Sequence, residues 1–207
     1  STLGYSLMNL IENAKGEIYF ENRLISNLKK KDLKQLRKEI QIIFQDPYSS
    51  LNPRLTIGRA IEEVLIVHKI EKDKNKRKEM VMEMLEKVGL EREHYERYPH
   101  EFSGGQRQRI GIARALILKP KLIICDESVS ALDVSVQATV LNLLNDLKKE
   151  FQLTYIFISH DLAVVKYMSD RMMVMRKGEI EQIGEADEIY TNPQTQYTKT
   201  LISSIPK

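Results

Sequence analysis

One segment of this chain, an apolar run that ends in two adjacent carboxylates, constrains the fold more than any other. Residues 122–125 (LIIC) are continuously apolar, and Asp126 and Glu127 follow them directly. Continuous apolar strands that alternate with helices are typical of a parallel sheet covered on both faces. Polar residues at the carboxyl end of such a strand lie where open α/β sheets bind their ligands. We therefore expect an α/β fold with a ligand site beside Asp126 and Glu127.

The segments on either side of this run fit the same class. Apolar runs indicate further strands at 40–44, 155–159 and 171–175, and apolar periodicity indicates a helix at 134–151. Pro120 ends another helix, which begins after Gly105. Strands and helices therefore alternate through the second half of the chain.

Helical patterns dominate the stretch between 48 and 105. Apolar residues recur at helical spacing in 57–70 and 79–90, with the charged segment 69–79 as a connector and Gly89 as a C-cap. We therefore predict two parts. Residues 1–47 and 106–207 form an α/β core with a C-terminal helical tail, and 48–105 form an inserted α-helical subdomain.

Composition excludes several classes of protein. The chain has 207 residues, enough for a sizeable core, and its 42% hydrophobic content is that of a globular protein. A net charge of +3, from 32 basic and 29 acidic residues, does not indicate a nucleic-acid partner. The single cysteine excludes an internal disulfide framework and fits a reducing compartment. No apolar run is long enough to span a membrane. We expect a soluble, cytoplasmic protein.

A serine and two glycines stand in front of the helix that begins after Gly105. Glycines allow a phosphate to come close to the backbone, and a helix N-terminus offers unpaired N–H donors and about half a positive charge. Ser103-Gly104-Gly105-Gln106 is therefore a candidate anion-binding segment. The alternative is a plain helix cap, which serine commonly makes.

Three more polar residues border the predicted strands and helices. His160 follows the strand at 155–159, Gln45 follows the strand at 40–44, and Asp133 precedes the helix at 134–151. Taken singly, each has an ordinary structural interpretation, such as a helix cap for Asp133. For His160, the position at the end of the next parallel strand makes a functional role the better interpretation. Gln45 and Asp133 are weak evidence by themselves and depend on the motifs around them.

These segments, in this order, resemble the ATP-binding cassette (ABC) ATPases. Residues 103–106 resemble the signature, 122–127 the Walker B segment, 128–133 the D-loop and Gln45 the Q-loop, and His160 resembles the switch histidine. The resemblance covers essentially the whole chain and implies a P-loop NTPase-type core with an inserted helical subdomain. It also implies an enzyme that hydrolyses ATP with Mg²⁺.

The resemblance assigns a role to each candidate residue. The catalytic residues would be Glu127, which polarises the attacking water, His160, which contacts the terminal phosphate, and Gln45. Asp126 and Gln45 would hold Mg²⁺, together with Ser1 at the end of the Walker A loop. The other residues on the nucleotide would be Thr2, Ser103, Gly104, Gly105, Gln106 and Asp133. The signature would serve ATP bound by a second ABC ATPase subunit, which implies a head-to-tail homo- or heterodimer.

Three segments of the sequence resemble one subfamily more closely, the ATP-binding subunits of oligopeptide and dipeptide importers. The segments are 45–54 (QDPYSSLNPR), 127–133 (ESVSALD) and the tail at 192–206. Nickel and metallophore importers have similar sequences in these segments, so nickel or a metallophore is the alternative substrate. The resemblance implies permease subunits as partners, an extracytoplasmic binding protein acting indirectly, and a peripheral location on the cytoplasmic face of the membrane. Residues 48–59 would receive a permease coupling helix. Rival classes are a non-catalytic partner subunit and a soluble ABC ATPase.

The beginning of the chain lacks one expected element. The first residues are Ser1-Thr2-Leu3, and the first methionine, Met8, falls inside the predicted helix 2–11. The glycine-rich loop and lysine of Walker A, which should come just before Ser1, are absent. We expect the chain to be a fragment of a longer ATPase and predict that it is inactive alone.

Overall fold

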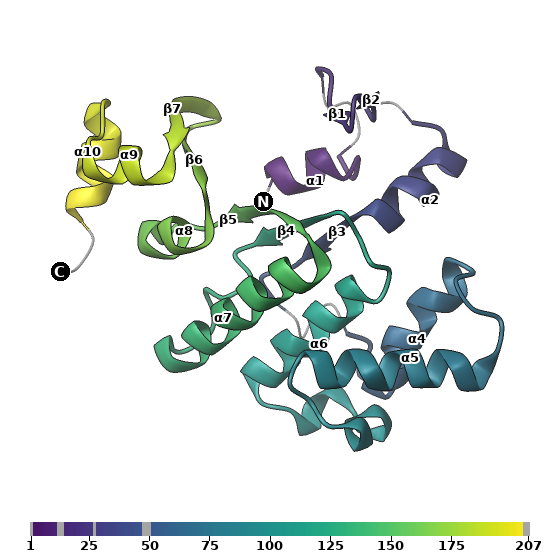
Figure 1. Cartoon of the computed structure of the whole chain (residues 1–207). Helices are drawn as coiled ribbons and strands as arrows, with labels where there is room; N and C mark the ends of the chain where they lie inside the picture. Colours follow the sequence, from purple (N-terminus) through teal and green to yellow (C-terminus); the bar gives the residue numbers. More distant parts are fainter. Residues whose placement is uncertain (1, 12–14, 27, 47–50, 205–207) are drawn as a thin grey trace. The chain divides into compact units, whose positions relative to one another are not determined.

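The computed structural model describes residues 2–11, 15–26, 28–46 and 51–204 (Figure 1). The chain forms two compact units, Ser1–Ile156 and Phe157–Lys207. The predicted boundary of an inserted subdomain at 48–105 stays a prediction.

A three-stranded sheet is the centre of the first unit. Its order is β3 (Ile40–Ile43), β4 (Leu122–Asp126) and β5 (Thr154–Ile158), whose last two residues belong to the second unit. β3 and β4 are parallel, with Ile40 opposite Leu122 and Ile43 opposite Cys125. Every residue of β4 is buried, as a continuous apolar run predicts. The predicted parallel α/β core is confirmed.

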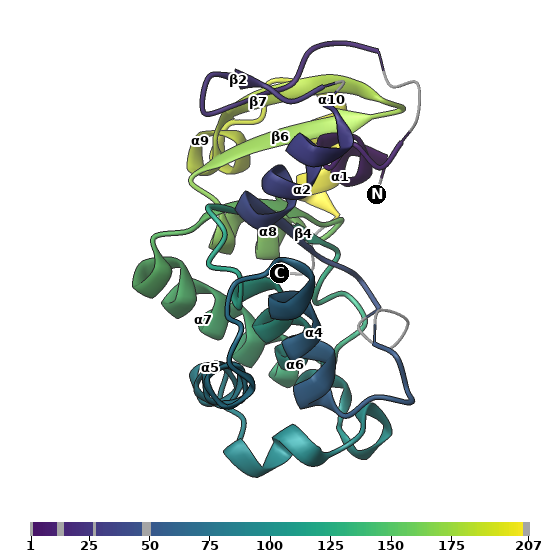
Figure 2. The ribbon, with the colours of Figure 1, turned by 90° about the vertical axis from the view of Figure 1, so that its right-hand side faces the viewer.

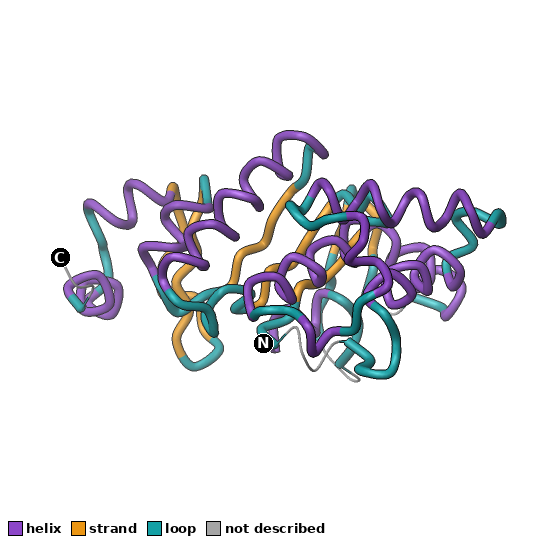
Figure 3. The backbone as a smooth tube through the Cα atoms, turned by 90° about the horizontal axis from the view of Figure 1, so that it is seen from below, coloured by secondary structure: helices purple, strands orange, loops and turns teal. Residues whose placement is uncertain are grey.

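Helices lie on both sides of these strands (Figure 3). α6 (Gly104–Leu116) contacts β3 and α7 (Val134–Phe151), and α2 (Lys30–Glu39) leads directly into β3. The Cys125 side chain in β4 is fully buried, and this burial raises the pKa of its thiol to about 12. The sheet is therefore shielded from water at its central strand.

The N-terminal segment contains α1 (Thr2–Leu7) and a short antiparallel pair, β1 (Tyr19–Phe20) and β2 (Arg23–Leu24). α1 is shorter than the helix predicted for 2–11. The chain turns after Leu7, and Asn9 takes a left-handed backbone with a φ of 52°. The Asn9 side-chain amide donates to the carbonyl of Ile25, which ties this turn to the segment after β2.

The helical part of the first unit contains α4 (Ile57–Val67), α5 (Lys74–Lys87) and the short 3₁₀ helices η1 (Arg92–Glu96) and η2 (Pro99–Glu101). α5 begins within the segment predicted to be a connector, so that prediction is wrong from Lys74 onward. The cause is Asp73, whose carboxylate accepts a hydrogen bond from the Lys76 N–H at 2.9 Å. Gly89 follows the helix with a φ of 72°, as expected of a C-cap glycine.

A buried polar cluster joins α4, α5 and η1. The Glu62 carboxylate accepts hydrogen bonds from Arg77 Nε and from the Tyr95 hydroxyl, both at 2.9 Å. Only 7% of Glu62 is exposed. The Tyr95 ring lies against Gly58, where an added Cβ would come within 2.3 Å of it. One carboxylate therefore connects three helical elements around a close helix–ring contact.

The second unit is a hairpin covered by helices. α8 (Leu162–Met168) precedes β6 (Arg171–Arg176) and β7 (Glu179–Glu185), and α9 (Ala186–Thr191) and α10 (Gln196–Ser203) follow them. β6 and β7 pair antiparallel, and Figure 2 shows this hairpin along its length. The tight turn at Lys177 and Gly178, both with positive φ, permits this pairing. Within the described chain the parallel pattern therefore does not extend to β6 and β7.

The hairpin has its own small core. Val165, Met172, Val174, Ala186 and Ile189 are buried together, and the helices α9 and α10 follow the hairpin. Among the helices of the described segments, none is long and apolar enough to cross a membrane.

Candidate functional site

Asp126 and Glu127 lie at the carboxyl end of β4. Asp126 is buried, with 5% of its surface exposed, and Glu127 is half-buried. Glu127 takes a left-handed backbone, with a φ of 49°, which costs a non-glycine residue about 1 kcal/mol or more. Ser130 stabilises this turn, because its N–H and its Oγ both donate to the Glu127 carbonyl, at 3.1 and 2.9 Å. The two consecutive carboxylates therefore lie in different environments, Asp126 in a buried one and Glu127 in a half-buried one.

The donors at this edge of the sheet suit Mg²⁺. Asp126 ends β4 and Gln45 follows the adjacent parallel strand β3, so a carboxylate and an amide oxygen stand at neighbouring strand ends. Mg²⁺ prefers oxygen ligands, and in nucleotide sites it takes few of them from the protein. The described residues contain no cluster of three or more His, Cys, Asp or Glu side chains that could hold a metal. The donor set therefore fits a metal shared with a phosphate.

The segment Ser103–Gln106 forms the N-terminus of α6. Ser103 Oγ accepts from the Gln106 N–H at 3.3 Å, and Gln106 Oε1 accepts from the Ser103 N–H at 3.0 Å. This reciprocal capping box is the structural alternative that the sequence left open, and it is present. It orients the first turn of α6, whose remaining N–H groups favour an anion.

Asp133 caps α7. Its carboxylate accepts from the Val136 N–H at 3.0 Å and from Ser135 Oγ at 2.8 Å. These hydrogen bonds, the one from Val136 first, lower the pKa of the Asp133 carboxyl. The cap is thus a feature of the chain itself, while the predicted contact across a dimer stays a prediction.

The structure does not test the roles of the other candidates. Gln45 and Thr2 are exposed in the first unit, Thr2 as the first residue of α1. His160 is exposed after β5 and belongs to the second unit, whereas Glu127 belongs to the first. Ser1 lies outside the described residues. Their roles on ATP and Mg²⁺ therefore stay predictions.

A cavity that sequence reasoning missed lies between β3, α4 and α6. Its volume is about 440 Å³, and its lining includes Phe44, Val64, His68, Gln108, Arg114 and Leu118. Gln108 is 1% exposed, and its Nε2 has no hydrogen-bond partner in the described structure; the same holds for Nδ1 of His68. The lining comes from segments far apart in the chain, so no local pattern could have indicated it.

His68 should make stability pH-dependent. Burial first, and then three positive charges on α2, lower the pKa of His68 from 6.5; the charges belong to Lys38, Lys34 and Arg37. Below pH 6.5 the unfolded chain therefore binds more protons than the folded chain. The stabilisation that depends on a neutral His68 is complete above pH 6.5. It is lost as the pH falls through the pKa of His68 in the folded chain.

The test compares denaturant midpoints of the wild type and His68→Gln at about pH 8 and about pH 5.5. We expect the wild type to lose more stability than the variant on acidification. Equal losses in both proteins would show that His68 is not responsible.

Comparison with known proteins decides the family. The sequence profile described as "ABC transporter" matches residues 1–130. The chain belongs to the ABC transporter family. The predicted resemblance and fold class are therefore confirmed.

Individual ABC proteins are similar over the whole chain. The oligopeptide transport ATP-binding protein OppF of Bacillus subtilis is 54% identical over all 207 residues, and the match covers 68% of that protein. The glutathione import ATP-binding protein GsiA of Pectobacterium atrosepticum is 51% identical, again over the whole chain but over 33% of its own length. The chain thus spans about two thirds of the OppF length.

Solved ABC structures share the fold. The ATP-binding cassette MJ0796, in a dimeric post-hydrolysis state with ADP and Pi, has a TM-score of 0.77 at 28% identity, over 89% of this chain and 79% of its own. For cbiO1 of Clostridium perfringens, part of the ABC transporter complex cbiONQ, the TM-score is 0.81 at 27% identity, over 92% and 74%.

Proposed function

We propose that this chain is the ATP-binding and ATP-hydrolysing part of an ABC importer of oligopeptides or dipeptides. The observation that carries the proposal is the 54% identity to OppF of Bacillus subtilis over the whole chain. The two carboxylates at the end of β4 supply the matching chemistry, because phosphoryl transfer depends on positioning and charge stabilisation. The intact protein is an ATPase in this proposal.

The proposed roles follow the resemblance to the ABC ATPases. Asp126 and Gln45, with Ser1, would hold Mg²⁺, which would supply positive charge to neutralise the phosphates. Glu127, on its fixed turn, orients and polarises the attacking water, and His160 contacts the terminal phosphate. Thr2 assists at the phosphate end of the nucleotide. Each role requires bound ATP. Isothermal titration calorimetry measures the binding of ATP directly.

The signature segment serves the nucleotide of a second ABC ATPase subunit in this proposal. An added Cβ at Gly104 would lie 3.6 Å from Leu132 Cδ2, an ordinary contact, so packing inside the chain does not require glycine there. Glycine at this position suits the close approach of a phosphate instead. Ser103, Gln106 and Asp133 complete this face. Two subunits related head to tail therefore enclose each ATP.

The cavity between β3, α4 and α6 supports a permease partner on the cytoplasmic face of the membrane. Its lining includes the apolar side chains of Phe44, Val64 and Leu118 and the exposed Val67 at the end of α4. The predicted coupling-helix segment 48–59 precedes α4; Tyr48, Ser49 and Ser50 lie outside the described residues. Arg54 and Arg59 in this segment are exposed. We propose that the segment and the cavity together receive a permease helix, with an extracytoplasmic binding protein acting through the permease.

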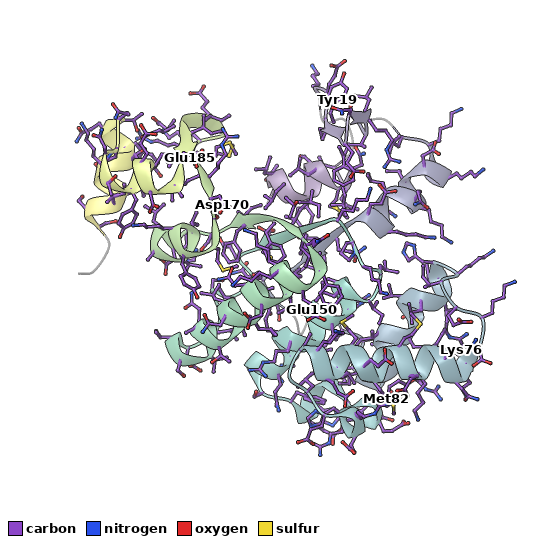
Figure 4. All side chains as sticks on the ribbon, viewed as in Figure 1. Tyr19, Lys76, Met82, Glu150, Asp170 and Glu185 are labelled. Atoms are coloured by element: carbon purple, nitrogen blue, oxygen red, sulfur yellow. The ribbon has the colours of Figure 1, made fainter. Side chains whose placement is uncertain are left out.

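Charge reversal tests the permease contact. The double variant Arg54→Glu, Arg59→Glu should lower co-purification with the permease about tenfold or more, because like charges at an interface cost several kcal/mol. The control is Lys76→Glu, since Lys76 is exposed on α5 (Figure 4). Unchanged assembly and transport in the double variant would place the contact elsewhere.

Transport measurements test the function itself. Deleting the gene should abolish uptake of labelled oligopeptides, and complementation should restore it. Loss of nickel uptake with normal peptide uptake would instead support the nickel and metallophore alternative. A soluble ABC ATPase would leave both uptake activities unchanged and would not fractionate with membranes.

A further inference from the structure

The signature segment contacts the start of α7 within one chain. α6 packs against α7, and a Cβ added at Gly105 would lie 2.4 Å from Val136 Cγ1, closer than non-bonded carbon atoms approach. The corresponding distance at Gly104, 3.6 Å to Leu132 Cδ2, is ordinary. Internal packing therefore requires glycine at position 105 and not at position 104.

Val136 is held in turn by the segment that follows Glu127. Its N–H donates to Asp133 Oδ1 at 3.0 Å. The Leu132 N–H donates to the Val129 carbonyl at 3.2 Å. Ser130 binds the Glu127 carbonyl through its N–H and its Oγ. A hydrogen-bonded turn thus leads from the second carboxylate to the contact with Gly105.

We infer that Val136 is a positioning residue that locks the signature segment, Ser103–Gln106, to the segment 127–133 of its own chain. A contact with no room for a methyl group transmits displacement, because packed interiors are hardly compressible. A displacement of one segment is therefore passed to the other.

The consequence rests on the proposed function. Glu127 acts on the nucleotide of its own chain, whereas Ser103 and Gly104 act on the nucleotide of the partner subunit. A shift of the turn at one nucleotide is thus carried to the other through Gly105 and Val136.

A double-mutant cycle tests the lock. Gly105→Ala should lower both the denaturant midpoint of the chain and the ATP turnover of the assembled transporter, the latter about tenfold, because the added methyl group overpacks the contact. Val136→Ala alone should lower kcat up to about threefold and leave KM for ATP unchanged, since it affects positioning and not binding. The double variant should have an ATP turnover within about threefold of that of Val136→Ala. Its denaturant midpoint should equal that of Val136→Ala.

Gly104→Ala is the matched control. It should leave the midpoint unchanged, reduce turnover strongly, and gain nothing from Val136→Ala, because its methyl group meets the phosphate and not α7. If Gly104→Ala leaves turnover intact, the proposed anion-facing role of the segment fails, and the lock is unaffected.

The lock itself is overturned by either of two results. One is that Gly105→Ala keeps its full loss of turnover in the double variant, which would assign Gly105 to the ligand. The other is that Val136→Ala raises KM while kcat stays constant, which would show a binding role.

Discussion

Glu127→Gln should lower kcat for ATP hydrolysis by the assembled transporter by about three orders of magnitude, with ATP binding retained. The amide keeps the size of the side chain and removes the charge that polarises water, and general-base assistance is worth about 10²–10⁴-fold. The left-handed turn at Glu127 depends on hydrogen bonds to its backbone carbonyl, so the substitution leaves the turn intact. Steady-state phosphate release measures kcat, and calorimetry measures the affinity for ATP.

The control for this variant is Glu83→Gln. Glu83 is exposed on α5, and the substitution makes the same chemical change at a residue outside the candidate site. It should leave turnover unchanged. Residual turnover above about a tenth of wild type in Glu127→Gln would assign the general base to another residue.

Glu62→Ala should lower the free energy of unfolding by about 3 kcal/mol, since removing one partner of a buried ion pair leaves an uncompensated charge. Arg77 is the residue left behind; 14% of its side chain is exposed, so the loss falls at the lower end of the range for buried pairs. The Tyr95 hydroxyl loses its acceptor in the same variant. Urea titration measures the change.

Glu79→Ala is the matched comparison for Glu62→Ala. Glu79 pairs with Arg92 on the surface of the same helical region, and 52% of its side chain is exposed. Exposed pairs contribute little to stability, so its midpoint should stay close to wild type. Similar shifts in both variants would mean that burial does not distinguish the two ion pairs.

The sequence predicted the helices and strands whose ends are marked by particular residues, such as a capping side chain or the end of an apolar run. The helix at 134–151 occurs with the predicted bounds, because Asp133 caps it. The apolar run at 122–125 forms a strand, which ends at Asp126. The start of α5 was missed, although Asp73 is an ordinary N-cap, because the charged residues around it hid the apolar spacing. The antiparallel pairing of β6 with β7 depends on a tight turn, which the apolar pattern of the strands does not report.

In the candidate site, too, features within one segment were predictable and contacts between segments were not. Neighbouring motif residues such as Asp126 and Glu127 were predictable, because one strand end positions both. The contact of Gly105 with Val136 and the cavity beside Gln108 were not, because each joins residues from separate helices or strands. Such contacts depend on how elements pack, and periodicity along one segment carries no information about its neighbour.

Cys125 gives this protein an internal reporter of its own opening. It is the only cysteine, it sits in the central strand, and the raised pKa of its thiol leaves almost no thiolate at neutral pH. A thiol reagent can therefore react only with molecules in which β4 has come away from its neighbours. The rate of labelling then measures how often the sheet opens, and the same assay reads whether ATP or a partner subunit closes it.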